Sequence, residues 1–312
     1  MKLILERWNQ FLNEGDLNEP EWGSEAWKLK EPMYELFYGE YPYKESKPSE
    51  GFAYIKKKRG DFIKKYGRAE YAKMKREFQE SLKSGNYPAL MRRKLKPTEG
   101  RTQGGLRNMD LAGLDISGAD LSKVDFYRCS LVGTNLQGCT LKQLNGCNLN
   151  NANLSMADFT KSEEAAIIVN CFGDNVNVRG ANMSNVKMKD NDFQSANMQG
   201  TYLMGANIQG GKLEKSNLEG AVLMGATISG VSLNGSSLQG AKMIGANLEG
   251  ADLSGANLEG ATYDVNTKLP EGANPKALGM VKKKGPGRSW PRRHLPTFYK
   301  AARRIGLNED KQ

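Results

Sequence analysis

The residues best suited to chemistry in this sequence are four cysteines and one histidine. Cys129, Cys139 and Cys147 each precede a leucine by two residues, a spacing that places both side chains on the inner face of a short extended segment. Buried thiols in such positions act as small apolar side chains. Cys171 lies in a stretch of different pattern, so we expect it to be the most reactive thiol. His294 stands in a basic tail without partners for acid–base or metal chemistry.

We therefore expect no catalytic residue, metal site, cofactor or small-molecule substrate. The outward Asn and Asp residues, such as Asn247, Asp252 and Asn257, could form a calcium or carbohydrate face. Short polar side chains are also what stacked turns favour, and we prefer that interpretation.

Composition excludes several other classes of protein. The 312 residues carry 45 Lys plus Arg against 35 Asp plus Glu, and 38% of them are hydrophobic. No apolar run approaches the roughly 18 residues of a membrane span, and the N-terminus lacks the apolar stretch of a signal peptide. The four cysteines show no paired spacing, so a disulfide scaffold is not expected.

A five-residue repeat organises the middle of the chain, as the segment GANLEGADLSGANLEGA at 245–261 illustrates. A large apolar residue recurs every fifth position, with a small residue two places before it and mostly glycine two places after. This period fits neither a helix nor a long strand, but it fits short extended segments joined by corners. We expect the large residues to stack inward as a structural ladder that includes Leu218, Leu223, Leu238, Leu248, Leu253 and Leu258.

This pattern resembles the pentapeptide-repeat family, whose motif is A-(D/N)-L-x-x. The resemblance implies an all-β solenoid, a right-handed quadrilateral β-helix with four pentapeptides per coil. Two breaks interrupt the phase, between Leu141 and Leu149 and between Phe159 and Val178. Counting around them gives 29 repeats, or about seven coils, with a loop or bulge in the irregular stretch near 160–177.

Charge and composition divide the chain into four parts. Residues 1–105 form a mainly helical docking region of net charge +6 with an aromatic segment, and 106–263 form the solenoid of net charge −4. Residues 264–281 resemble the closing segment of the family, and 282–312 form a basic linker and short helix. Helices are expected over 53–84, separated at Gly67.

The two flanks carry the candidate partner-binding residues. At the N-terminal end these are Trp8, Phe11, Leu12, Trp22 and Trp27, because large aromatic and apolar side chains make efficient anchors. At the C-terminal end they are Arg292, Arg293, Tyr299, Arg303 and Arg304. The residues up to about Gly15 are expected to form a short amphipathic helix, which could equally pack on its own domain. Basic runs such as 56–59 leave nucleic-acid contact open, although complements to acidic protein surfaces are the preferred interpretation.

Two functions follow as hypotheses. The first is a non-enzymatic structural or interaction protein, held in a larger assembly by its N-terminal helices and basic tail. The opening residues 3–14 resemble the start of structural proteins of marine tailed bacteriophages, so we expect a virion component such as a decoration, spike or connector. Its partners would be other virion proteins or a second copy. The resemblance to the pentapeptide-repeat family implies an alternative, a cytoplasmic DNA mimic that binds and protects DNA gyrase, which needs a strongly acidic rod.

Overall fold

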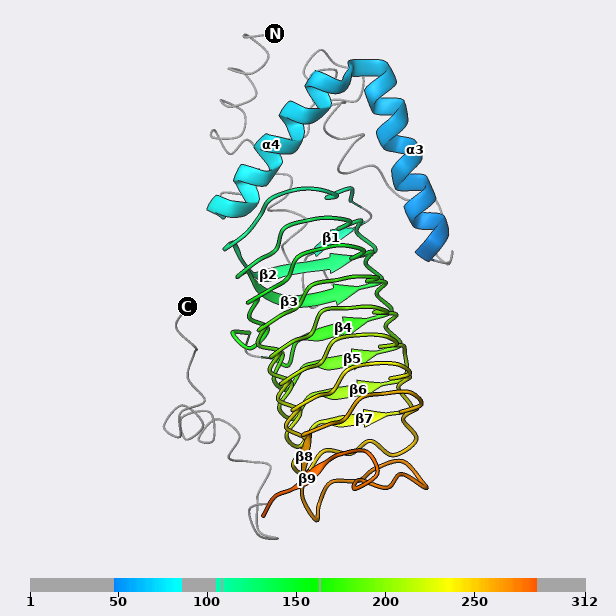
Figure 1. Ribbon diagram of the computed structural model, residues 1–312. Helices are drawn as coiled ribbons and strands as arrows, with labels where there is room; N and C mark the ends of the chain where they lie inside the picture. Colours follow the sequence, from blue (N-terminus) through cyan, green and yellow to red (C-terminus); the bar gives the residue numbers. More distant parts are fainter. Residues whose placement is uncertain (1–47, 86–104, 108, 163, 285–312) are drawn as a thin grey trace.

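The molecule is a β-solenoid of about nine turns, with two helices at its N-terminal end (Figure 1). The computed structural model describes residues 48–85, 105–107, 109–162 and 164–284. The helices are α3 (Pro48–Tyr66) and α4 (Arg68–Ser84), and Gly67 between them has φ +91°. The predicted helical stretch with a break at Gly67 is therefore confirmed, and it begins five residues earlier than expected.

One side of the solenoid is a parallel sheet of seven short strands in chain order. The strands are β1 (Gly105–Arg107), β2 (Asp120–Tyr127), β3 (Thr140–Asn145), β4 (Ile167–Val169), β5 (Lys187–Lys189), β6 (Asn207–Gln209) and β7 (Thr227–Ser229). A second pair, β8 (Thr262–Tyr263) and β9 (Val281–Lys282), closes the C-terminal end. Isolated parallel bridges continue the stacking on the other sides.

The coil has four sides, which we name faces A to D in chain order, with β1–β7 on face A. The inward central residues of face A, one per coil, are Leu106, Phe126, Leu144, Ile168, Met188, Ile208, Ile228 and Leu248. In a regular coil the central residues of faces B, C and D follow five, ten and fifteen residues later. Each central residue is preceded by an outward residue and, two places before it, by a small inward one. The resulting core is continuous from Phe62 to Met280.

Eight complete coils precede the closing turn, one more than the seven coils expected from the number of repeats in the sequence. Leu144 and Ile168 are central residues of face A, and Gly173 is the central residue of face B in the fourth coil. Leu144 follows Leu141 by three positions in place of five, so one corner is two residues short. Ile168 follows Phe159 by nine positions, so the same corner one coil later is four residues longer than a regular one. The irregularity therefore lies between Phe159 and Ala166, and the regular pattern resumes well before residue 177.

The repeat around Gly173 is not recognisable in the sequence, because a central position normally holds a large apolar residue. Phe193, the central residue of the next coil, is 2% exposed and fills the space. A Cβ at position 173 would lie 2.6 Å from Phe193 Cδ1 and 2.8 Å from its Cε1. A glycine and an oversized neighbour thus replace two medium-sized residues at constant volume.

Helix α4 covers the open N-terminal end of the solenoid. Its buried residues Met74, Phe78 and Leu82 belong to the same core as the first coil. Because a terminal coil exposes an apolar cross-section and unpaired strand edges, such a cover is required for stability. The apolar side of α4 is thus used within the chain. That the N-terminal region also docks an external partner stays a prediction.

Residues after Tyr263 close the opposite end. Lys268 bridges Asn247 on face A, and β9 pairs with β8 beneath face D. Asp264 accepts hydrogen bonds from the backbone N–H of Gly245 at 2.9 Å and from Thr267 Oγ1 at 2.9 Å. The chain thereby forms one last turn with its own side-chain bonds in place of a further coil.

Candidate interaction surfaces

The predicted partner-binding residues of both flanks lie outside the described residues. This holds for Trp8, Phe11, Leu12, Trp22, Trp27, Arg292, Arg293, Tyr299, Arg303 and Arg304. The predicted ladder leucines lie in the solenoid: Leu218, Leu223, Leu238, Leu248 and Leu258 are at most 1% exposed. Leu253 is only partly buried, because it belongs to the last coil, where the closing segment covers face B less completely.

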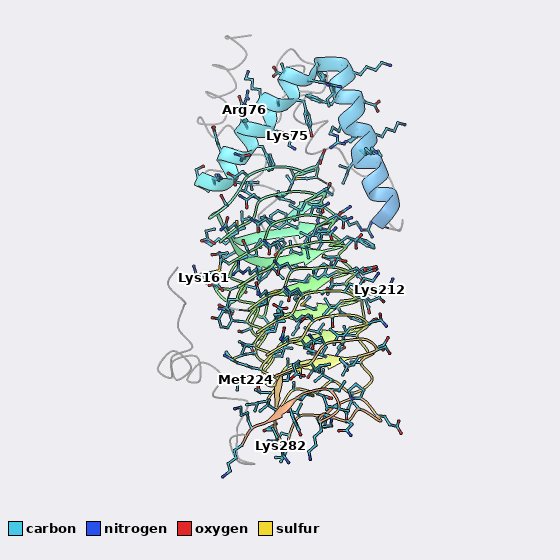
Figure 2. All side chains as sticks on the ribbon, viewed as in Figure 1. Lys75, Arg76, Lys161, Lys212, Met224 and Lys282 are labelled. Atoms are coloured by element: carbon cyan, nitrogen blue, oxygen red, sulfur yellow. The ribbon has the colours of Figure 1, made fainter. Side chains whose placement is uncertain are left out.

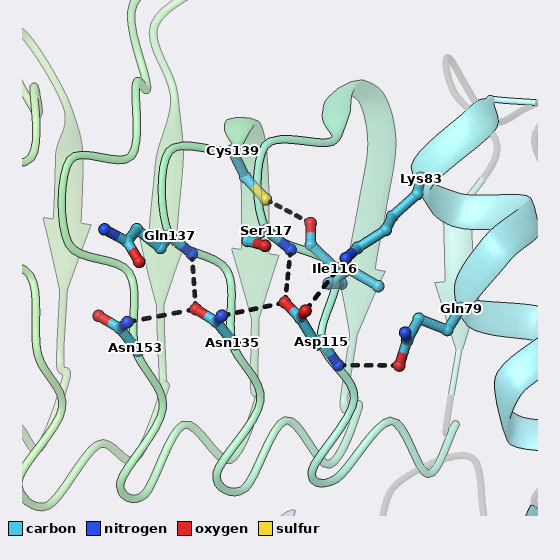
Figure 3. A network of polar contacts seen from close by, with 9 residues as sticks. All are labelled: Gln79, Lys83, Asp115, Ile116, Ser117, Asn135, Gln137, Cys139 and Asn153. Atoms are coloured by element: carbon cyan, nitrogen blue, oxygen red, sulfur yellow. Dashed lines mark hydrogen bonds and ion pairs between the residues drawn. The ribbon is translucent and has the colours of Figure 1, made fainter.

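The contact between α4 and the first coil is polar at its rim (Figure 3). In inner coils the N–H of an outward residue bonds a carbonyl of the coil before it, as Asn135 N–H does with Leu114 O at 2.8 Å. Asp115 has no coil above it, and its N–H instead donates to Gln79 Oε1 at 3.0 Å. Lys83 Nζ lies 3.1 Å from Asp115 Oδ2. Side chains of α4 therefore supply the bonds that a preceding coil would have made.

Charge also matches across this contact. The outward residues of faces B, C and D in the first coil are Asp110, Asp115 and Asp120, while residues 48–84 carry 11 basic and 5 acidic side chains. Arg59 Nη1 lies 3.4 Å from Asp110 Oδ2, which also accepts from Tyr71 OH at 3.1 Å. Part of the basic run at 56–59 thus contacts the chain's own acidic coil, although Lys56 and Lys57 remain exposed.

From Asp115 a column of side-chain amides runs down face C. Asn135 Nδ2 donates to Asp115 Oδ1 at 2.9 Å, and Asn153 Nδ2 donates to Asn135 Oδ1 at 3.2 Å. Each Oδ1 also accepts a backbone N–H two residues later, as Asn135 does from Gln137 at 3.2 Å. Hydrogen bonds from Ser117, followed by that from Lys83, lower the pKa of Asp115 to about 2. These bonds already use the oxygens that a calcium or carbohydrate face would need.

A polar cluster forms where the two irregular corners meet. Lys142 in the short corner pairs with Glu164 in the long corner at 3.3 Å. Nearby Asp125 is 1% exposed, and neither of its carboxylate oxygens has a hydrogen-bond partner among the described residues. Burial raises the pKa of Asp125, while the charges of Lys142 and Arg107 partly oppose that rise. The cluster arises from the register break, and no sequence motif announced it.

We expect Asp125→Asn to stabilise the protein more at pH 7.5 than at pH 4.5. A raised pKa in the folded state means that this carboxyl favours folding below its unfolded pKa, and that this contribution is lost as the pH rises through the folded pKa. Asparagine removes the charge but keeps the shape. Urea unfolding of both proteins at the two pH values measures the difference. If the difference in unfolding free energy between the two proteins were the same at both pH values, a raised pKa of Asp125 would be contradicted.

All four cysteines are free and buried. Cys129, Cys147 and Cys171 occupy the small inward position of face B in successive coils, and Cys139 occupies that of face D. Burial raises the pKa of Cys139 to about 11 and those of Cys129 and Cys147 well above the usual range. The expectation that Cys171 is the most reactive thiol is wrong, because this residue belongs to a regular repeat and is 1% exposed.

In the native state, fewer than one of the four thiols should react with a thiol reagent within an hour at pH 8. A buried thiol is not accessible to the reagent. Ser254→Cys is the matched control, since position 254 is exposed and its thiol should react within minutes. All four native thiols should react in guanidinium. Rapid labelling of Cys171 in the folded protein would refute its placement.

An apolar surface on face D was not anticipated from the sequence. In the third and fourth coils, the outward residues of this face and those just after the centre are polar, for example Asn182 and Ser184. In the fifth to seventh coils the position just after the centre holds Met204, Met224 and Ile244, while the outward position holds Tyr202, Val222 and then Lys242. We call this surface the face D stripe; it comprises Tyr202, Met204, Val222, Met224, Ile244 and Val281. Its signal in the sequence was a change of residue type at fixed positions of the repeat.

Within the part of the chain that the structure describes, no group of three or more His, Cys, Asp or Glu side chains is placed to hold a metal ion. None of the helices described is both long and apolar enough to cross a bilayer. The outward charges are mixed, with Lys187, Lys189 and Lys212 among the acidic residues. What the described surface offers is long regular faces, a polar cluster and the face D stripe.

These features define the class: a four-sided β-solenoid built from five-residue repeats and closed at both ends by its own chain. The model of the pentapeptide repeats matches eight copies, over residues 106–143, 129–163, 174–210, 202–240 and 232–262. A pentapeptide repeat protein from Nostoc Pcc 7120, alr5209, is 32% identical over 33% of this chain and 84% of its own, with a TM-score of 0.22. The chain belongs to the pentapeptide repeat family.

Two other solved structures share the repeat. QnrB1, a plasmid-mediated fluoroquinolone resistance protein, is 20% identical over 66% of this chain and 92% of its own, with a TM-score of 0.27. HetL, involved in heterocyst differentiation regulation in Nostoc sp. strain PCC 7120, is 25% identical over 54% of this chain and 90% of its own, with a TM-score of 0.22. A comparison with curated proteins found no match.

Proposed function

We propose that this protein is a non-enzymatic structural and interaction protein, a rigid rod held in a larger protein assembly. One observation carries the proposal: a single core runs from Phe62 to Met280, and the chain itself covers both ends. A closed rod does not extend by adding further copies end to end. Its contacts must therefore come from its faces or from the segments at its two ends.

The segments beyond the described rod supply the anchors in this proposal. Residues 1–47 contain the aromatic candidates Trp8, Phe11, Trp22 and Trp27, and residues 285–312 contain the arginine candidates. Because α3 and α4 are engaged with the first coil, the N-terminal anchor is confined to residues before Pro48. The resemblance of residues 3–14 to phage structural proteins supports a bacteriophage particle as the assembly and the virion as the location.

Mass spectrometry of phage particles from cells that carry this gene tests the assembly. The chain should copurify with particles at a fixed ratio to the major capsid protein. A Trp8→Ala and Phe11→Ala double variant should lose that association, whereas Asn234→Ala on face B should keep it. Absence of the wild-type chain from every particle fraction would refute a virion role.

The gyrase alternative receives no support from the charges of the rod. A DNA mimic needs rows of carboxylates that copy phosphates, but residues 106–263 hold 11 basic against 15 acidic side chains. The amide column of face C is neutral below Asp115. A supercoiling assay with the full chain decides the point: inhibition at nanomolar protein would favour gyrase binding over the assembly role.

A further inference from the structure

Helix α3 packs against the rest of the molecule along one side. Ile55 and Phe62 are 5% and 3% exposed, and Arg59 Nη1 lies 3.4 Å from Asp110 Oδ2 of the first coil. At about 100° per residue, these three side chains of α3 lie within about 60° of one another around the helix. The opposite side of α3 is therefore turned away from the solenoid, as the arrangement of the helices shows (Figure 1).

This opposite side of α3 carries four lysines and one acidic residue. We call it the α3 outer face; it comprises the exposed residues of the helix between Tyr54 and Tyr66, which are Lys56, Lys57, Gly60, Asp61, Lys64 and Lys65. Lys56, Gly60 and Lys64 follow one another at intervals of one turn, and Lys57 lies beside them on the same arc of the helix. The face therefore presents three lysines around a central glycine.

Gly60 is not required by the packing of α3. A Cβ at this position would meet no heavy atom within 4 Å. Glycine inside a helix is also less favourable than alanine, so helix stability would favour a side chain here. A glycine at such a position lets another molecule approach the backbone closely. Lys56 and Lys64, one turn away on either side, flank the point of approach.

The residue types of the α3 outer face suit a duplex phosphate backbone better than a protein or a lipid surface. Protein partners are anchored by aromatic and large apolar side chains, and helices on membranes bury an apolar side; the exposed residues of this face supply neither. Single strands stack their bases on aromatic rings, but the adjoining Tyr54 is half-buried, with Lys58 Nζ 5.4 Å from its ring centre. Lysines without apolar neighbours contact phosphates irrespective of base sequence.

The dimensions and the charge distribution of the molecule support contact at this end. From Lys56 to Lys64 the helix rises about 12 Å, a length over which duplex DNA carries about seven phosphate charges. The solenoid holds 15 acidic and 11 basic side chains in residues 106–263, so phosphates repel it weakly. Basic helices on an acidic rod favour one orientation, in which α3 touches the duplex and the solenoid points away.

We propose that the α3 outer face binds the phosphate backbone of duplex DNA in a contact that does not read the base sequence. Lys56, Lys57 and Lys64 pair with phosphates, and the backbone at Gly60 lies against the strand. Asp61 lies beyond Lys57 around the helix and stays outside the contact. This surface is separate from the protein anchors under "Proposed function", and the inference does not depend on the identity of the assembly.

Fluorescence anisotropy of a short labelled DNA duplex, titrated with the full chain at about 50 mM salt, tests the proposal. The face variant replaces three lysines of α3: Lys56→Gln, Lys57→Gln and Lys64→Gln. The matched control removes the same charge from exposed lysines of the solenoid: Lys187→Gln, Lys189→Gln and Lys212→Gln. Glutamine keeps the helix propensity of lysine, so α3 should stay folded.

The face variant should bind the duplex at least tenfold more weakly than the wild type, and the control less than threefold more weakly. Equal losses in the two variants would overturn the proposal, because net charge would then explain the binding. Unchanged affinity in the face variant would also overturn it, and so would a wild-type chain that does not bind the duplex.

Salt dependence measures the number of phosphates contacted by this face. Loss of three contacts should make the slope of log affinity against log salt shallower by about 2.7 in the face variant. Gly60→Gln leaves the charge unchanged and should weaken binding at least threefold, because its side chain keeps the backbone away from the duplex. An unchanged slope in the face variant, or wild-type affinity in Gly60→Gln, would contradict the proposed contact.

Vesicles rich in phosphatidylserine distinguish DNA from a lipid surface that offers similar charge. The wild-type chain should bind them at least tenfold more weakly than the duplex at the same concentration of phosphate groups. Equal or tighter binding to the vesicles, lost in the face variant, would overturn the proposal and assign the α3 outer face to a membrane surface.

Discussion

Replacing Gly173 with leucine is expected to lower the unfolding free energy by about 3 kcal/mol, at the upper end of typical overpacking. Position 173 is a central position of face B, but Phe193 already occupies its space, and even a Cβ there would lie 2.6 Å from that ring. Neither residue can shift far within a stack of coils. Urea unfolding followed by circular dichroism measures the loss.

Phe193→Leu should rescue this variant. The rescue distinguishes a specific clash with Phe193 from a general intolerance of position 173 to any side chain. Alone, Phe193→Leu leaves a cavity and costs about 1 kcal/mol. Together with Gly173→Leu it restores the leucine stack that Leu213 and Leu233 form lower on the same face. The double variant should lose only about 1 kcal/mol in place of the additive sum of about 4, a coupling of about 3 kcal/mol. Additive losses would mean that Gly173 is not stacked on Phe193.

Leu82→Ala is expected to cost about 3 kcal/mol and to loosen the N-terminal end selectively. Leu82 is fully buried in α4 against the core of the first coil, and Leu-to-Ala changes in cores cost about 2–5 kcal/mol. Solenoid coils are stabilised mainly by their neighbours, so the loss should be local. Hydrogen exchange should speed up for amides of residues 106–121 and stay unchanged for residues 203–243.

Arg76→Ala is the matched control for this prediction, because Arg76 lies on the exposed side of the same helix (Figure 2). It should change the unfolding free energy by less than about 0.5 kcal/mol. If Leu82→Ala left exchange in the first coil untouched, α4 would not be a functional cover. The helices would then be available to an outside partner after all.

The solenoid could be predicted from the sequence because its repeat is a physical necessity of stacking. A coil buries its inner side chains only against its neighbours, so large, small and turn residues must recur in phase. Leu218, Leu223 and Leu238 recur in this way, and all three are buried. The paired helices were predictable for a similar reason, since an apolar stripe ended at Gly67 and resumed after it.

The features that could not be predicted from the sequence depend on contacts between residues far apart in it. Gly173 does not look like a central residue, because the side chain that fills its place is Phe193 in the next coil. Asp125 lies inside a cluster that needs one short corner and one long corner in adjacent coils. The contact between side chains of α4 and Asp115 of the first coil also joins segments distant in the sequence. The stripe of Val222 and Met224 could have been found by comparing equivalent positions of the repeat across coils.

The central claim is that residues 105–282 form one continuous solenoid, and that its described residues contact other molecules through the outer faces. A crystal structure of the full chain tests it most directly. We expect Ile168 stacked between Leu144 and Met188, Glu164 and Ala165 exposed outside the coil, and α4 seated on the first coil. A structure with Ile168 outside the column of Leu144 and Met188, or with a cleft between the fourth coil and its neighbours, would contradict it.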